Sequence, residues 1–326
     1  MPIRINLGQG DYLTPLNAQE LLQIEEDFLQ KCVMCRENLT EETKTVEHIY
    51  PKWLQKQFGL WDKKLVFPNG SSMPYRQITV PCCKACNGGI MSEWEKQVGN
   101  AVSKGYDSFI NLDEEIIAWW VYKLYYTKLV KELSLKNDLK NPDSEMMFTN
   151  QLLSEYKPIY YYMCELLKGT KFVCPKPYEL YVYRTAADNS FDYLDDISRH
   201  VVYIKMNDIL VVCALDSFSF FNMQYEREIR GLNALERVEP IQALELFAKI
   251  VYFRSHYKFD TGHRNIITDQ GLLIDSKIVN PVQLREFKIE ELYAMMVSML
   301  RWRGYEGEVP KWQEGKMFTL IPCNTK

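Results

Sequence analysis

Cys32-Val33-Met34-Cys35 and Cys83-Lys84-Ala85-Cys86 are two Cys-x-x-Cys motifs separated by residues 36–82. Each such motif places two thiolates on one side of a tight turn, and two motifs complete the tetrahedral ligand set that Zn²⁺ prefers. The pairs therefore predict a structural zinc site with Cys32, Cys35, Cys83 and Cys86 as ligands. Because this spacer is longer than in a compact zinc finger, we expect further structure between the motifs.

The other cysteines do not form the pattern of a disulfide framework. Five of the nine cysteines lie between Cys32 and Cys86, and the rest are scattered. In a reducing compartment, clustered cysteines more often hold a metal than form disulfides. Cys82 offers an alternative pairing with Cys86, but the spacing of Cys83 and Cys86 is the better chelate. We therefore interpret Cys82 as a spectator thiol.

The composition is that of a folded protein. The chain has 326 residues, of which 47% are hydrophobic and 25% charged, with a formal net charge of -4. These values exclude a wholly disordered, collagenous or coiled-coil chain, and the length allows two domains. Residues 51–104 nevertheless carry eight basic and three acidic side chains. The basic residues that we expect to contact phosphate are Lys52, Lys56, Lys63, Lys64, Arg76 and Lys84.

The sequence lacks the signals that direct a chain to a membrane. Residues 1–6 do not start a continuous apolar core of the kind found in a secretory signal. No apolar run approaches the roughly 20 residues needed to cross a bilayer. We therefore expect a cytoplasmic protein that does not associate with a membrane.

The pattern of apolar residues predicts an α+β protein in two parts. Thr14-Pro15 and the amphipathic run to Phe28 predict an N-terminal helix, which we place with the zinc motifs in a first module of residues 1–106. Residues 107–326 are predicted to form a larger accessory α+β domain without a catalytic signature. Its expected helices cover residues 111–131, 243–253 and 287–300, and its expected strands cover 179–183, 200–205 and 209–215, the last two joined as a hairpin.

Polar residues of the types that act in catalysis or bind metals lie between the cysteine motifs and directly after the second one. Val46-Glu47-His48-Ile49-Tyr50-Pro51 lies in the spacer, and Asn87 follows Cys86. Neighbouring residues in a regular strand project to opposite faces, so Glu47 and His48 serve one site only if a bend or bulge intervenes. Gly88-Gly89 permits a sharp entry into a helix, where Glu95 would lie near the azimuth of Asn87. The alternative for Glu95 is a solvated helix face.

In this order, Cys-x-x-Cys, Glu-His-Ile-x-Pro and Cys-x-x-Cys-Asn resemble the zinc-knuckle branch of the HNH endonucleases. The resemblance spans about Cys32 to Glu95, and the helix predicted over residues 116–131 is similar to one that follows the nuclease module in some such proteins. The resemblance implies a ββα-metal module that a four-cysteine zinc site stabilises. His48 matches the general base, Glu47 the acidic ligand of a catalytic Mg²⁺ or Mn²⁺, and Asn87 the last motif residue, which binds or positions that ion.

Two residues of the proposed site have open assignments. Glu95 is a further candidate ligand of the catalytic ion. The family's central Asn, which orients the histidine, has no counterpart in residues 75–81, so Gln77 or Asn69 is the candidate for that role.

The resemblance implies a metal-dependent DNA endonuclease or nickase acting on double- or single-stranded DNA. A histidine with an unperturbed pKa near 6.5 accepts a proton from water at neutral pH, and a hard divalent ion stabilises charge on the phosphate. One site cuts one strand, so double-strand cleavage needs a homodimer, two nicks or a partner protein. Nucleases with such an accessory domain often resemble effectors in phage defence or mobile-element biology. The alternative is a non-catalytic zinc module that binds nucleic acid or a protein partner.

Overall fold

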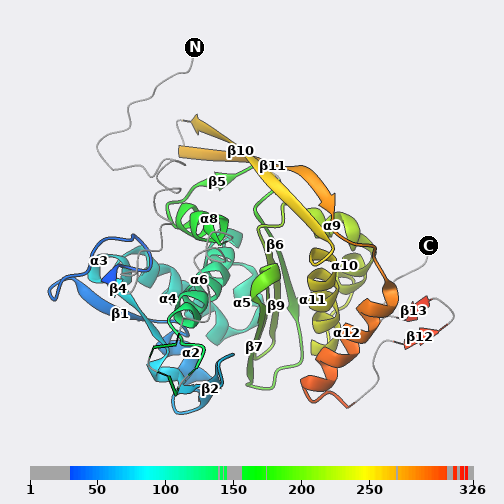
Figure 1. The fold of residues 1–326 in the computed structure, drawn as a ribbon, viewed down its shortest axis with the longest axis horizontal. Helices are drawn as coiled ribbons and strands as arrows, with labels where there is room; N and C mark the ends of the chain where they lie inside the picture. The colour runs from blue at the N-terminus through cyan, green and yellow to red at the C-terminus, as the bar shows by residue number, and fades with distance from the viewer. Residues whose placement is uncertain are drawn as a thin grey trace. The chain divides into compact units, whose positions relative to one another are not determined.

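The computed structural model (Figure 1) describes residues 30–138, 140–141, 143–144, 156–173, 175–268, 271–306, 311–313, 316–318 and 320–321. The helix predicted between Thr14 and Phe28 lies outside these residues. The chain combines helices with strands, which confirms the predicted α+β class. It divides into two compact units, the first comprising Met1–Gly99, Tyr122–Lys171 and Asn265–Leu273, the second Asn100–Val121, Phe172–Arg264 and Ile274–Lys326. The domain boundary predicted at residues 106 and 107 stays a prediction.

Unit 1 is built around two short antiparallel strand pairs and the helices that follow them. Its strands are β1 (Lys44–His48), β2 (Lys64–Val66), β3 (Ser72–Pro74) and β4 (Thr79–Cys83). Its helical segments include α2 (Lys52–Gln57), the 3₁₀ helix η2 (Tyr75–Gln77), α3 (Lys84–Gly88), most of α4 (Ile90–Lys104), the second half of α6 (Glu114–Leu133) and α8 (Lys157–Leu167). Strands β1 and β4 pair with Lys44 opposite Cys83 and His48 opposite Thr79. Since α3 follows β4 directly, the second cysteine motif begins in a strand and ends in a helix (Figure 1).

Two glycines set the course of α4. A Cβ atom on Gly89, between α3 and α4, would lie 2.7 Å from the backbone O of Ala85, so only glycine fits this turn. A Cβ atom on Gly99 would lie 2.9 Å from the indole ring of Trp53. Helix α4 therefore starts afresh after α3 and packs closely against α2.

Unit 2 is a four-stranded antiparallel sheet with helices packed against it. The sheet order is β6-β9-β8-β7, formed by β6 (Tyr178–Arg184), β7 (Phe191–Asp196), β8 (Val201–Met206) and β9 (Ile209–Leu215). Its helices include α5 (Tyr106–Ile110), α9 (Phe220–Gln224), α10 (Glu226–Asn233), α11 (Pro240–Arg254) and α12 (Ile289–Trp302). Apolar side chains of the sheet and of α11 form one buried core, and α11 and α12 lie side by side (Figure 1).

The three strands predicted in unit 2 and two of its helices are present, whereas β7, α5, α9 and α10 were not predicted. The predicted hairpin over residues 200–215 is confirmed, and Asn207 adopts the left-handed conformation of its turn with φ of 51°. The helices predicted over residues 243–253 and 287–300 are also present. Helix α6 begins at Glu114, three residues later than predicted, because the Asn111 side chain donates to the backbone O of Asp107 and ends α5 instead.

The described residues also contain two further groups of strands and the 3₁₀ helix η3 (Ile197–Arg199). The sheet order β10-β11-β5 joins β10 (Tyr257–Thr268), β11 (Gly271–Gln283) and β5 (Lys171–Phe172). Strands β12 (Lys311–Gln313) and β13 (Lys316–Phe318) form an antiparallel pair.

Helix α6 has 20 residues, which is about the length that a membrane-spanning helix needs. Within the ranges that the structure describes, no helix has both the length and the apolar composition needed to cross a membrane.

Candidate metal centre and adjoining acidic site

The four cysteines of the two motifs converge on one point. The sulfur atoms of Cys32, Cys35, Cys83 and Cys86 all lie within 4.8 Å of one another, and those of Cys35 and Cys83 are 3.8 Å apart. Zinc–sulfur bonds of about 2.3 Å in a regular tetrahedron require sulfur separations of about 3.8 Å. The thiols therefore fit a metal ion such as zinc without large rearrangement.

Backbone hydrogen bonds hold the two motifs in this arrangement. The backbone N of Val33 donates to Pro81 O at 3.0 Å, which joins the first motif to β4. The amides of Cys83 and Cys86 donate to the sulfurs of Cys32 and Cys83, each at 3.3 Å. Amide donors of this kind favour the thiolate form that metal binding requires.

Cys82 lies next to the four motif cysteines but outside the group that converges. Hydrogen bonds from the other thiols, first from Cys35, lower the pKa of Cys32, as suits a thiolate ligand. Cys82 is buried and lies 3.7 Å from Cys32. A hydrogen bond with Cys32, and then burial, raise the pKa of Cys82. Hydrogen bonds with Cys32 also raise the pKa of Cys35 and Cys86, so it is the position of Cys82 outside the four converging sulfur atoms that agrees with a spectator thiol.

Glu47 and His48 leave β1 on opposite faces, because the register of β1 with β4 is regular through both residues. Glu47 shares its face with Val80, and both are buried. His48 shares the other face with Thr79, and both are half-buried. The two predicted catalytic side chains therefore point to opposite faces of β1, and no bulge turns them to the same face.

The Glu47 carboxylate is engaged by a lysine that the sequence analysis did not single out. The Nζ atom of Lys123, in α6, lies 2.5 Å from Glu47 Oε1, 2.7 Å from Glu95 Oε1 and 3.1 Å from the backbone O of His48. The Lys123 side chain is 0% exposed. Burial opposes its charged form, but Glu47 and Glu95 outweigh burial and raise the pKa of Lys123. The ammonium is therefore charged and lies between two carboxylates.

Glu95 belongs to this buried group and not to a solvated helix face. Burial raises the pKa of the Glu95 carboxyl, Lys123 opposes that shift, and Glu47 adds to it. Glu93, two residues earlier on α4, is exposed. The oxygen donors of Glu47 and Glu95 suit a hard divalent ion in chemistry, but an ammonium lies between them.

Asn87 contacts the strand that carries His48, whereas among the described residues neither candidate for the central Asn forms a hydrogen bond with His48. The Asn87 Nδ2 atom donates to the backbone O of Val46 at 3.0 Å, which ties α3 to β1. Asn69 Nδ2 donates to Lys136 O at 2.9 Å, so this side chain is used away from His48. Gln77 is exposed. The backbone of Arg76 opposes the lowering of the His48 pKa, but it is the weakest of the influences on that ring.

The His48 imidazole is suited to the neutral form. Burial, followed by the nearby charge of Lys52, lowers the pKa of His48, while Glu47 opposes this shift. A neutral imidazole has one ring nitrogen free to accept a proton. Lys52 also supplies positive charge beside that ring.

The predicted phosphate-contacting residues are mostly free to meet a ligand. Lys52, Lys56, Lys63, Lys64 and Lys84 have exposed side chains. Arg76 is half-buried and forms an ion pair with Asp62. Five of the six residues thus remain consistent with electrostatic contact to a polyanion.

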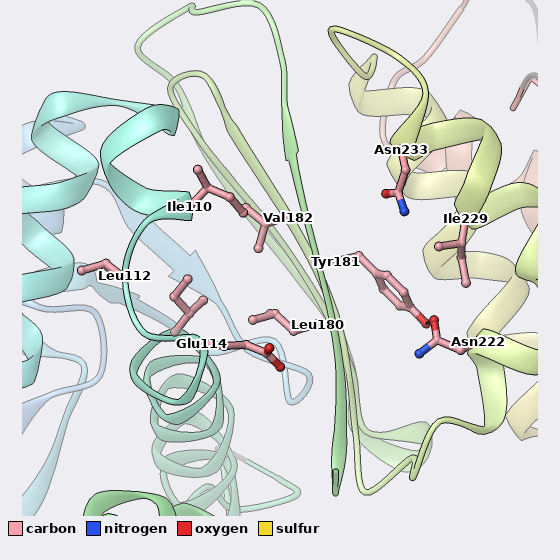
Figure 2. Close-up of a pocket in the computed structure, with 10 residues that line it drawn as sticks. Ile110, Leu112, Glu114, Leu180, Tyr181, Val182, Asn222, Ile229 and Asn233 are labelled. Atoms are coloured by element: carbon pink, nitrogen blue, oxygen red, sulfur yellow. Dashed lines mark hydrogen bonds between the residues drawn. The ribbon is translucent and has the colours of Figure 1, made fainter. Parts of the chain in front are cut away.

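Unit 2 has a pocket of about 410 Å³ along β6 (Figure 2). Its lining comprises Ile110, Leu112, Glu114, Ile117, Leu180, Tyr181, Val182, Asn222, Ile229 and Asn233. Figure 2 shows Leu180 and Val182 on one side of the strand and Tyr181 on the other, where its hydroxyl donates to Asn222 Oδ1 at 3.1 Å. The lining includes no histidine or cysteine, so this pocket is not a second thiol or imidazole site.

Comparison with known proteins gives no match, since no family model, no curated protein and no solved structure matches this chain. The candidate site therefore rests on its own geometry.

One feature of the sequence would have pointed to Lys123. Lys123 interrupts the apolar run Ile116–Tyr126, and the other residues of this run are all buried. A lysine at the centre of such a helix needs an acidic partner. The sequence does not show which acidic residues those are.

Proposed function

We propose that the chain is a zinc-stapled endonuclease of the HNH type that hydrolyses DNA phosphodiester bonds. The observation that carries this proposal is the pairing of β1 with β4. It places Glu47 opposite Val80 and His48 opposite Thr79, on the strand that leads into the second cysteine motif, and the Asn87 side chain of α3 donates to Val46 O at 3.0 Å. Residues separated along the chain thus meet in the order that the HNH resemblance implies.

His48 acts as the general base in this proposal. Burial and the charge of Lys52 lower the pKa of His48, which leaves a neutral ring nitrogen to accept the proton of the attacking water. Lys52, beside His48, attracts the phosphate, and the other exposed lysines of residues 52–84 contact neighbouring phosphates. Glu47 and Asn87, with Glu95 as a further ligand, would hold a Mg²⁺ or Mn²⁺ ion, which when bound supplies positive charge to the phosphate and the leaving oxygen.

The zinc site has a structural role in this proposal. Four thiolates fill a tetrahedral coordination sphere and leave no open position for water, as in closed structural zinc sites. The zinc ion would hold the first motif against β4 and fix the start of α3, from which Asn87 projects.

A second candidate function is supported by two observations. Lys123 already neutralises charge at Glu47 and Glu95, and Glu47 and His48 leave β1 on opposite faces without the bulge that would bring both into one site. Both observations fit a non-catalytic zinc module that binds nucleic acid through its lysines. A supercoiled-plasmid nicking assay on zinc-loaded protein, with and without added Mg²⁺ or Mn²⁺, separates the two functions. The nuclease nicks only with the added ion, whereas the binding module shifts the plasmid in a gel without nicking it.

A further inference from the structure

Lys123 joins three parts of unit 1 through one atom. Its Nζ contacts Glu47 Oε1 and the His48 backbone O, both from β1, and Glu95 Oε1 from α4. An ammonium group has three N–H donors, and here each has an acceptor within hydrogen-bonding distance.

Three oxygen atoms that converge on one point also form part of the ligand set of a hard divalent cation. Carboxylate and backbone carbonyl oxygens are the ligands of Ca²⁺, and Mg²⁺ and Mn²⁺ prefer the same atoms. The ammonium therefore stands at the point where a cation bound by Glu47 and Glu95 would be placed. It carries a single positive charge, so the two carboxylates keep one negative charge in excess.

We propose that Lys123 is an internal counter-cation, and that a divalent ion binds Glu47 and Glu95 only in competition with the Lys123 ammonium. This deepens the proposed function by naming what controls ion binding at the site, and it rests on that proposal only for the role of the ion in hydrolysis. Removing the ammonium while keeping both carboxylates should convert these ion pairs within the chain into an ion-binding site.

Manganese binding to the zinc-loaded protein tests this proposal. Lys123→Met keeps an unbranched side chain of similar length and removes the charge. We expect the variant to bind one Mn²⁺ per chain at least tenfold more tightly than the unsubstituted protein, measured by the loss of the free Mn²⁺ signal in electron paramagnetic resonance. Equal or weaker binding by Lys123→Met would overturn the proposal.

A triple variant, Lys123→Met with Glu47→Gln and Glu95→Gln, provides the matched control. It lacks both the ammonium and the carboxylates, so no charge is left uncompensated at this position. We expect it to lose the additional Mn²⁺ site. Binding as tight as that of Lys123→Met would place the ion elsewhere and would also overturn the proposal.

Folding of Lys123→Met is part of the same test. Two carboxylates that lose their counter-charge, Glu47 buried and Glu95 half-buried, destabilise a protein, so this variant should melt at a lower temperature than the triple variant. Mn²⁺ should restore its melting temperature by binding the folded state, and should leave that of the unsubstituted protein nearly unchanged. If Lys123→Met fails to fold even with Mn²⁺ while the triple variant folds, an ion cannot replace Lys123 and the proposal is wrong.

These readouts do not depend on cleavage. Tighter Mn²⁺ binding by Lys123→Met without nicking by either protein would support the counter-cation and reject the nuclease. Mn²⁺-dependent nicking with no effect of Lys123 on binding would give the reverse result.

Discussion

The side chain of Asn87 is hydrogen-bonded to the backbone of Val46, with 3.0 Å between Nδ2 and the carbonyl O. This bond joins the helix that follows the second cysteine motif to the strand that carries Glu47 and His48. Because the amide nitrogen is used in this bond, the oxygen of the same amide is the atom left to meet a ligand. The bond and the ligand role of Asn87 can therefore be separated by substitution.

Asn87→Asp retains an oxygen at this position but removes the donor to Val46. A net hydrogen bond is worth about 1 kcal/mol, and a carboxylate facing a carbonyl oxygen is repelled. We expect nicking to fall about tenfold in Asn87→Asp and further in Asn87→Ala, which loses both functions. Initial rates on supercoiled plasmid measure this, and full activity of Asn87→Asp would show that the bond to Val46 is dispensable.

Zinc should be required for unit 1 to fold. Cys35→Ser removes one of the four converging thiols, so we expect loss of the bound zinc and of the cooperative melting of unit 1. Cys82→Ala removes a buried thiol outside the set, and we expect it to keep one zinc per chain. Elemental analysis and thermal melting measure both variants. Zinc retention by Cys35→Ser together with its loss in Cys82→Ala would reassign the ligands.

A buried carboxyl in unit 2 should make stability depend on pH. Burial raises the pKa of Asp216 to about 6, although Arg254 opposes the shift. A raised folded-state pKa stabilises the fold below the unfolded value, near 3.9, and this contribution is lost as pH rises through 6. Asn imitates the protonated form and tolerates the φ of 56° at this position. We expect Asp216→Asn to be more stable by on the order of 2 kcal/mol at pH 8, with the difference vanishing near pH 4.

Urea unfolding at several pH values measures this effect. A variant less stable than the unsubstituted protein at pH 8 would show that the pairing of Asp216 with Arg254, 3.8 Å apart, outweighs the cost of burial.

The exposed lysines of unit 1 should account for the salt dependence of DNA binding. Each lysine that contacts a duplex phosphate adds about 0.9 to the slope of log affinity against log salt concentration. We expect substitution of Lys52, Lys56, Lys63 and Lys64 by alanine to reduce this slope by about 3.6, measured by fluorescence anisotropy. Arg237→Ala, which removes an exposed cation of unit 2, is the control and should leave the slope unchanged.

The elements that the sequence predicted well are those with a local signal. The spacing within each motif identified the four cysteines that meet, and alternating apolar residues located the hairpin that turns at Asn207. Asn111 was misassigned because the same side chain can start one helix or end another, and the choice depends on the preceding turn. The contacts of Lys123 were missed because Glu47 lies far away in the chain, and no local pattern encodes such a pairing.

The most direct test of the central claim compares the nicking of supercoiled plasmid by zinc-loaded protein and by His48→Ala, with added Mn²⁺. Loss of a general base lowers a rate by about 10²–10⁴-fold. We predict Mn²⁺-dependent nicking by the unsubstituted protein and a loss of that size in His48→Ala, with zinc content and melting temperature unchanged. Equal rates for the two proteins, or no nicking by either, would contradict the assignment of this chain as an HNH-type nuclease.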